Sequence, residues 1–282
     1  MSSLSIFTSM TNPESRNDPW KEALNCYEYF ADEVEIVGQS WPEEFKWDYI
    51  GKVFQEGFDK CSSDWVMRMD IDYFIHEKYK NKLRKLLYKY EDYPAVSFPQ
   101  YQIFTPNRYQ IKTRICLLFN KKKYPEIKLN GGGDLTLATL KGKLIDPKKV
   151  PMINIPIFQY ESTFRTKEII KNDRARFARA WYRQFDTYKT RGGPSQAEAY
   201  NAWFNEIRKR YEKHCFKLKI SDHPQFIIDK IMNISSEQFG YDAFGLLNNT
   251  HFKNSFFLKG IREKYLNPLL YFPQRNYYLQ SE

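Results

Sequence analysis

The hydrophobic pattern of the first seventy residues alternates between the period of a strand and that of a helix. Short apolar runs typical of strands occupy residues 5–10, 34–38 and 64–72. Apolar residues at helical spacing occupy residues 18–30 and 47–61. Asp18 and Pro19 are suited to begin the first helix as its N-cap and first helical residue. A strand, helix, strand, helix, strand order favours right-handed crossovers and a parallel sheet.

The later segments continue an α/β pattern. Strands are predicted at 95–104, interrupted by Pro99, and at 111–119; helices are predicted at 75–90, 165–188 and from the capping box 195–198 to about 213. The glycine cluster Asn130-Gly131-Gly132-Gly133-Asp134 lacks the Gly-Lys-Ser/Thr of a phosphate loop. We therefore expect it to form a mobile loop beside the active site.

Composition and charge define the class of protein further. With 42% hydrophobic and 17% aromatic residues, the chain is expected to be folded and soluble. No run approaches the roughly 20 apolar residues of a membrane span, and four scattered cysteines indicate reduced thiols, so a cytoplasmic location is expected. Residues 1–100 carry 12 Lys+Arg and 18 Asp+Glu, a net charge of −6, whereas residues 101–282 carry +16. The two halves should therefore face different partners.

The run 64–72, Asp-Trp-Val-Met-Arg-Met-Asp-Ile-Asp, ends in two aspartates spaced by one residue. In an extended chain Asp70 and Asp72 project to the same side, with Arg68 behind them. Two such carboxylates can hold one hard dication, Mn²⁺ or Mg²⁺, which would neutralise charge on a diphosphate leaving group. Thr8–Met10 and Asp70–Asp72 fall at the carboxyl ends of predicted strands, where open sheets bind ligands.

With these residues in view, the chain resembles the family-two-like nucleotide-diphospho-sugar transferases of the GT-A fold, in particular stand-alone ones encoded by bacteriophages. The matching segments are 7–14 (FTSMTNPE), 47–52 (WDYIGK), 64–72 (DWVMRMDID) and 160–168 (YESTFRTKE). The resemblance covers roughly residues 4–190. It implies a Rossmann-like, mostly parallel α/β sheet flanked by helices, a GT-A domain at 1–190 and a helical extension at 191–282. The nucleotide-sugar half would span about 1–100 and the acceptor half about 101–190.

The resemblance also implies roles for individual residues. A nucleotide-sugar donor, with UDP-sugars favoured, would be bordered by Thr8, Met10, Glu14, Asp48, Lys52, Arg68 and Asp70. Asp70 and Asp72 would be the metal pair. Relatives often place a His where this chain has Gln159, which makes Gln159 the candidate third metal contact.

The transfer also needs a group that takes the proton of the acceptor hydroxyl. Asp134 is the first candidate, because a flexible loop could close it over the acceptor. Glu161 is the second. The alternatives are a plain Gly-Asp turn for Asp134 and a helix-start carboxylate for Glu161.

The basic second half of the chain indicates what kind of acceptor the protein would bind. Residues 165–191 hold nine Lys or Arg and three acidic residues. The aromatic residues Trp181, Tyr182 and Tyr188 are interspersed with these charges. This pattern favours nucleic acid, namely hydroxymethylated pyrimidine bases in DNA, contacted through Arg165, Lys167, Arg174, Arg176 and Arg179. A cell-surface glycan or polysaccharide acceptor is the alternative, since Lys-rich helices are usually solvated faces. A non-catalytic nucleic-acid-binding protein is the third reading.

Overall fold

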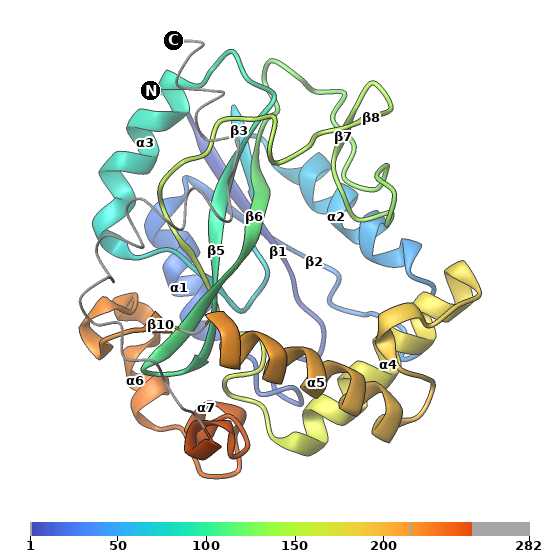
Figure 1. Cartoon of the computed structure of the whole chain (residues 1–282). Helices are drawn as coiled ribbons and strands as arrows, with labels where there is room; N and C mark the ends of the chain where they lie inside the picture. Colours follow the sequence, from blue (N-terminus) through green and yellow to red (C-terminus); the bar gives the residue numbers. More distant parts are fainter. Residues whose placement is uncertain (1, 215, 250–282) are drawn as a thin grey trace.

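The computed structural model describes residues 2–214 and 216–249 and places one large mixed sheet among helices (Figure 1). The strand order is β2-β1-β3-β6-β5-β9-β4, and β10 pairs with β6. The pairs β1–β2, β1–β3 and β5–β9 are parallel, whereas those of β6 with β3, β5 and β10, and β4–β9, are antiparallel. The predicted α/β class is confirmed, with parallel order concentrated in the N-terminal strands.

The N-terminal unit follows the predicted order. Its elements are β1 (Leu4–Ser9), α1 (Trp20–Phe30), β2 (Glu33–Val37), α2 (Asp48–Lys60) and β3 (Trp65–Arg68). The predicted helix start is wrong by one residue: Pro19 is the N-cap of α1 and makes no side-chain cap. Asp18 accepts hydrogen bonds from Arg165 instead.

The centre of the sheet is formed by two long antiparallel strands, β5 (Ala95–Thr105) and β6 (Arg108–Asn120). Pro99 does not interrupt β5, because the ladder to β9 (Ile157–Gln159) begins only at Gln100. The sheet ends at β4 (Tyr73–Phe74), which pairs with β9. The sequence pattern missed β4 and β9, since strands of two or three residues have no readable period.

The remaining elements surround this sheet. They are η1 (Glu77–Tyr79), α3 (Lys80–Lys89), β7 (Thr139–Leu140), β8 (Lys143–Leu144), α4 (Lys167–Phe185), η2 (Lys189–Arg191), α5 (Gln196–His214), β10 (Phe216–Lys217), η3 (Ile220–Asp222), η4 (Gln225–Ile227), α6 (Ile228–Met232), α7 (Phe239–Asp242) and η5 (Leu246–Asn249). Helices α4 and α5 pack against each other beside the sheet (Figure 1). The predicted capping box forms, since Ser195 N donates to Glu198 and Glu198 N to Ser195 Oγ.

The predicted C-terminal extension continues the fold of the body. Leu218, Ile227 and Ile231 belong to the same buried cluster as the strands, and β10 adds to the edge of β6. Residues 250–282 of the predicted extension lie outside the described residues, and the predicted domain boundaries stay a prediction.

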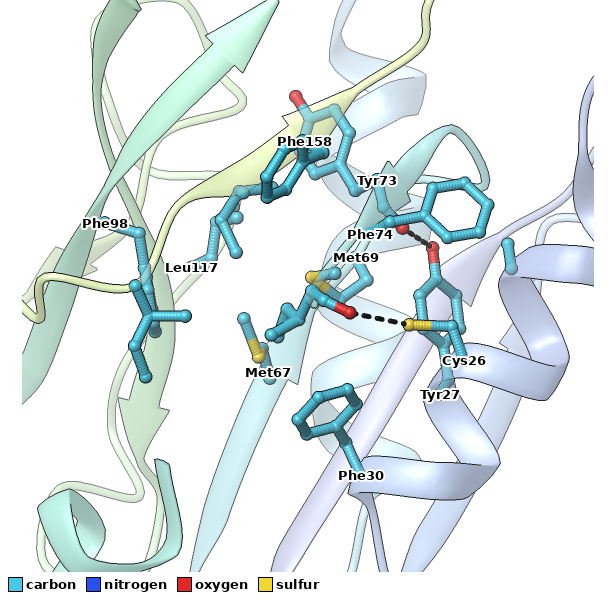
Figure 2. Close-up of a cluster of buried hydrophobic side chains, with 14 of the residues drawn as sticks. Cys26, Tyr27, Phe30, Met67, Met69, Tyr73, Phe74, Phe98, Leu117 and Phe158 are labelled. Atoms are coloured by element: carbon cyan, nitrogen blue, oxygen red, sulfur yellow. Dashed lines mark hydrogen bonds between the residues drawn. The ribbon is translucent and has the colours of Figure 1, made fainter. Parts of the chain in front are cut away.

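The main core lies between α1 and the sheet, and it reaches the turn after β3. Figure 2 shows Cys26, Tyr27 and Phe30 of α1 facing Met67, Met69 and Phe74. The Tyr27 hydroxyl lies 2.6 Å from the carbonyl oxygen of Asp70 and 3.0 Å from that of Tyr73. A buried phenol therefore holds the backbone of the segment that carries the paired aspartates.

Candidate active site

A cavity of about 500 Å³ opens at the carboxyl ends of β1 and β3. Its lining comes from these strand ends, from β6 and β9, from α2 and the segment before it, from the glycine loop, from residues 161–177 and from η2. Its lining residues are Ser9, Thr11, Arg16, Trp41, Trp47, Ile50, Phe54, Arg68, Asp70, Ile71, Asp72, Tyr73, Lys112, Asp134, Thr136, Gln159, Glu161, Arg165, Asp173, Arg174, Phe177 and Arg191. The cavity lies at the carboxyl ends of parallel strands, where the sequence predicted a ligand site.

Asp70 and Asp72 both line the cavity, but not from an extended strand. Strand β3 ends at Arg68, and the next residues form a turn in which Tyr73 N donates to the Asp70 carbonyl at 2.7 Å. The extended conformation expected for this segment is therefore wrong. The turn nevertheless brings both carboxylates to one cavity.

The carboxyl group of Asp72 has no direct side-chain partner among the described residues, and the charge of Arg165 nearby offsets its burial only in part. Asp72 is buried, and among the described residues its carboxylate takes part in no hydrogen bond or ion pair. Burial, followed by the nearby carboxylates of Asp70 and Glu161, raises the pKa of Asp72 to about 8. A cation bound here would relieve that repulsion.

Carboxylate oxygens are the ligands that Mn²⁺ or Mg²⁺ prefers. Within residues 2–214 and 216–249, no group of three or more His, Cys, Asp or Glu side chains is arranged to hold a metal. Mg²⁺ commonly binds through one or two carboxylates together with water and substrate phosphates. Asp70 and Asp72 would be those carboxylates.

Gln159 does not offer a free oxygen as a third metal contact. Its Oε1 accepts hydrogen bonds from Gln100 Nε2 at 2.9 Å and from Lys112 Nζ at 3.2 Å. A carbonyl oxygen bound to an ammonium group is a poor place for a second cation. We therefore assign Gln159 to the positioning of Lys112.

Arg68 lies where the sequence placed it, beside Asp70. Its Nε is 3.9 Å from Asp70 Oδ1, and its guanidinium carbon lies 4.4 Å from the centre of the Phe54 ring. Trp41, Trp47, Phe54 and Phe177 supply apolar surface to the cavity. The site therefore combines acidic, cationic and aromatic walls.

The glycine loop lies against α2 and brings Asp134 to the cavity. Trp47 Nε1 donates to the Asp134 carbonyl at 2.8 Å, and a Cβ added to Gly51 would lie 2.0 Å from the Leu135 carbonyl oxygen. The Asp134 carboxylate accepts from Thr136 N at 3.0 Å and from Thr136 Oγ1 at 2.9 Å. The Asp134 side chain therefore forms hydrogen bonds of the turn that was considered as its alternative role. Asp134 also lines the cavity.

Glu161 is held by cations. Arg174 donates to its carboxylate, and Lys112 Nζ lies 3.9 Å away. Burial acts to raise the pKa of Glu161, but Arg174 and Lys112 outweigh it and hold the pKa well below its usual range. Glu161 is thus ionised at neutral pH and able to accept a hydrogen bond.

Three of the predicted donor contacts do not line the cavity, two of them because of strand register. Thr8 and Met10 are buried beneath the site and absent from the cavity lining, whereas Ser9 and Thr11 line it. Successive strand residues point to opposite faces, so a shift of one residue exchanges them. Glu14 is exposed and lies beside Trp20 and Lys21.

Asp48 and Lys52 also lie outside this cavity. They pair with each other one turn apart on α2, at 2.7 Å, and neither lines the cavity. Lys52 lines a separate open groove on the outer face of α2. Ile50 and Phe54, on the inner face of the same helix, line the cavity instead.

The basic residues assigned to DNA are used largely within the protein. Arg176 donates to the carbonyls of Pro42 and Glu43, and Arg179 pairs with Glu44. Lys167 lies over the Tyr200 ring. Arg176 and Arg179 are thus engaged within the protein, whereas Lys167 is exposed, and DNA contact by these residues stays a prediction.

Arg165 and Arg174 line the cavity, but they too have internal partners. Arg165 is buried against Asp18 and Asp173, and Arg174 is paired with Glu161. Both guanidinium groups are therefore held in place by carboxylates at the cavity, and their contact with DNA stays a prediction.

Lys112 and Arg191 were not selected by sequence reasoning, yet both line the cavity. The Lys112 signal was a charged residue within a predicted strand. Arg191 stood out only as one of many cations in a basic segment.

Comparisons with known proteins give limited information. No family model and no curated protein matches this chain. Among solved structures, S. aureus TarS aligns over 81% of this chain and 50% of its own, at 9% identity and a TM-score of 0.33. This chain thus spans half the length of that neighbour.

Two structures of TarS 1-349 carry a bound nucleotide. The complex with UDP aligns over 74% of this chain and 72% of its own, at 8% identity and a TM-score of 0.34. The complex with UDP-GlcNAc aligns over 88% and 91%, at 9% identity and a TM-score of 0.33. At such low scores the likeness carries no weight for the activity, which has to be inferred from the cavity.

Two further observations concern membrane-spanning helices and the cysteines. No helix in the described ranges is long and apolar enough to cross a membrane. Cys26, Cys61 and Cys116 are free thiols, and burial raises the pKa of each to about 12.

Proposed function

We propose that the protein is a metal-dependent glycosyltransferase of the GT-A type, which moves a sugar from a nucleotide-diphospho-sugar to an acceptor hydroxyl. The observation that carries the proposal is the pair Asp70 and Asp72 at the end of β3, in a cavity with cationic and aromatic walls. The sequence resemblance at residues 7–14, 47–52, 64–72 and 160–168 supports the same activity.

The donor would lie along the cavity. The nucleoside would contact the aromatic wall at Trp41, Trp47 and Phe54, and Arg68 would face the diphosphate. A divalent cation held by Asp70 and Asp72 would supply positive charge beside that diphosphate. The separation of aromatic and charged walls suits a ligand with one apolar and one anionic part.

Glu161 is the carboxylate best placed for the acceptor. As the acceptor oxygen bonds to the anomeric carbon, the bond from that carbon to the diphosphate breaks, and its electron pair leaves with the diphosphate. The hydroxyl proton passes to Glu161. Because Arg174 and Lys112 keep Glu161 ionised, it first orients the hydroxyl and takes the proton as the new bond makes the oxygen acidic. Asp134 remains the alternative base.

The test is turnover of UDP- and GDP-sugars with Mn²⁺ or Mg²⁺. The variant Asp70→Asn/Asp72→Asn should lose more than about 100-fold of metal-dependent turnover, because the charge that stabilises the leaving group is lost. Asp48→Asn is the matched control, because Asp48 lies outside the cavity. Mn²⁺ should raise the unfolding temperature of the wild type and not of the double variant. Equal turnover in the double variant and the wild type would contradict the proposal.

A further inference from the structure

A second cavity, of about 420 Å³, adjoins the first. It lies between α4, α5 and the central strands, and it shares five lining residues with the first cavity. The shared residues are Lys112, Glu161, Arg174, Phe177 and Arg191. One wall, with Glu161 and Arg174 paired on it, therefore faces both cavities. A molecule in the second cavity would meet a donor in the first at this wall.

Arg191 adds a positive charge to this wall, and the nearby charge of Asp134 offsets it only in part. Its guanidinium carbon lies 4.3 Å from the ring centres of Trp47 and Trp181, and within the described residues it forms no ion pair. Burial, followed by the charge of Arg174, lowers its pKa to about 10. A cation destabilised in this way is stabilised when an anion binds beside it.

The far side of the cavity adds another cation. Arg210 on α5 lines the second cavity and not the first. Glu206 beside it pairs with Lys209 at 2.9 Å. Four cationic side chains, Lys112, Arg174, Arg191 and Arg210, thus face two carboxylates, Glu161 and Glu206. The cavity carries an excess of positive charge.

Small side chains leave the space open between the two helices. Ala178 of α4 and Ala199 and Ala202 of α5 line the cavity together with Trp203. The volume is at the lower end of small-molecule pockets, which span about 300–1,000 Å³. It suits a compact group with some apolar surface.

We propose that this second cavity is the acceptor subsite, and that it takes a saccharide or polyol carrying a phosphate or carboxylate beside the reacting hydroxyl. The inference rests on the proposed function and adds the acceptor class. A DNA duplex would need a broad cationic face around the opening, but Arg176 and Arg179 on α4 are bound to residues 42–44. An anionic saccharide uses the cations that line the cavity.

The experiment measures binding by calorimetry in the presence of saturating UDP and Mn²⁺, which fill the first cavity. The probes are glucose 6-phosphate against glucose, and glucuronate against its methyl ester. Each anionic probe should bind at least about tenfold more tightly than its neutral partner. Arg210→Gln should weaken the anionic probes about tenfold, as expected for loss of one hydrogen bond to a charged group.

Arg208→Gln is the matched control, because Arg208 is exposed on the same helix and does not line the cavity. It should bind both anionic probes as the wild type does. Equal binding of charged and neutral probes, or an Arg210→Gln variant that binds like the wild type, would overturn the inference. So would a hydroxymethylated DNA duplex that competes more strongly than either anionic probe.

The same samples separate this inference from the proposed function. Metal-dependent turnover of a nucleotide-sugar without any preference for anionic probes would reject the acceptor class alone. Arg210-dependent binding in a protein that turns over no nucleotide-sugar would reject the glycosyltransferase, and with it the acceptor role.

Discussion

Arg165 and Asp18, far apart in the sequence, form a buried ion pair with Arg165 Nη2 at 2.6 Å from Asp18 Oδ1. Arg165 also lies 3.1 Å from Asp173. Burial acts to lower the pKa of Arg165, but the carboxylates of Asp18 and Asp173 outweigh it and hold the pKa above its ordinary value. The pair links the segment before α1 to the segment before α4.

Removing this guanidinium should destabilise the protein strongly. Arg165→Met leaves Asp18 and Asp173 with Arg16 as their ion-pair partner among the described residues, and with Arg174 acting on Asp173 from farther away. We expect a loss of about 3 kcal/mol in the free energy of unfolding. Arg179→Gln, which removes a partly exposed pair with Glu44, should cost at most about 1 kcal/mol. Urea unfolding followed by circular dichroism measures both, and equal losses would contradict the structural role of Arg165.

Gly51 should be intolerant of alanine even though it lies inside a helix. Alanine normally stabilises a helix interior by up to about 1 kcal/mol relative to glycine. Here its Cβ would lie 2.0 Å from the Leu135 carbonyl oxygen, so the loop carrying Asp134 must move. Gly51→Ala should therefore lower the unfolding temperature and weaken UDP binding.

Gly133→Ala is the control for Gly51. It changes the same loop, but a Cβ at Gly133 would meet no atom within 4 Å. Thermal unfolding and UDP titration should leave this variant close to the wild type. A Gly51→Ala variant with wild-type values in both assays would show that the loop contact is unimportant.

His223 should contribute a pH dependence of stability. The Pro106 carbonyl lies 2.7 Å from Nε2, so Nε2 carries the proton and Nδ1 accepts from the Tyr160 hydroxyl. Burial lowers the pKa of His223 in the folded protein. A lowered folded pKa gives stability that is present above the unfolded pKa of about 6.5 and is lost as the pH falls below it.

The measurement is the free energy of unfolding between pH 7.5 and 5. The raised pKa of Asp72 makes stability fall with rising pH over this range, equally in both proteins. His223→Asn should therefore lack only the opposing contribution, so its stability should gain less, or lose more, than that of the wild type as the pH rises from 5 to 7.5. Burial also lowers the pKa of His76, so the comparison is best repeated in a His76→Asn background. Parallel slopes for the wild type and the His223 variant would exclude this contribution.

The sequence predicted those helices and strands that are long enough to show a repeating hydrophobic pattern. The β1-α1-β2-α2-β3 order and the two long central strands emerged from apolar spacing, because burial on one face imposes it. Strands β4 and β9 are too short to have a period. The position of Pro99 within β5 depends on the partner strand, which no local pattern encodes.

The site was predicted best where a local motif carried the chemistry. Asp70, Asp72, Asp134 and Glu161 all line one cavity. Thr8 and Met10 were misplaced because a shift of one strand residue reverses the face. The internal partners of the helix arginines could not be read from the sequence, because partners such as Glu44 for Arg179 lie far away in the chain and meet them only in the fold.

The Tyr27 hydroxyl bonds to the carbonyls of Asp70 and Tyr73. A buried side chain thus supports the turn that presents the two aspartates to the cavity. A library of random variants selected only for solubility should accept phenylalanine at this position. Selection for turnover should reject it, because the turn under the two aspartates would lose its support. The residues on which the proposed activity depends would therefore include side chains that no substrate can reach.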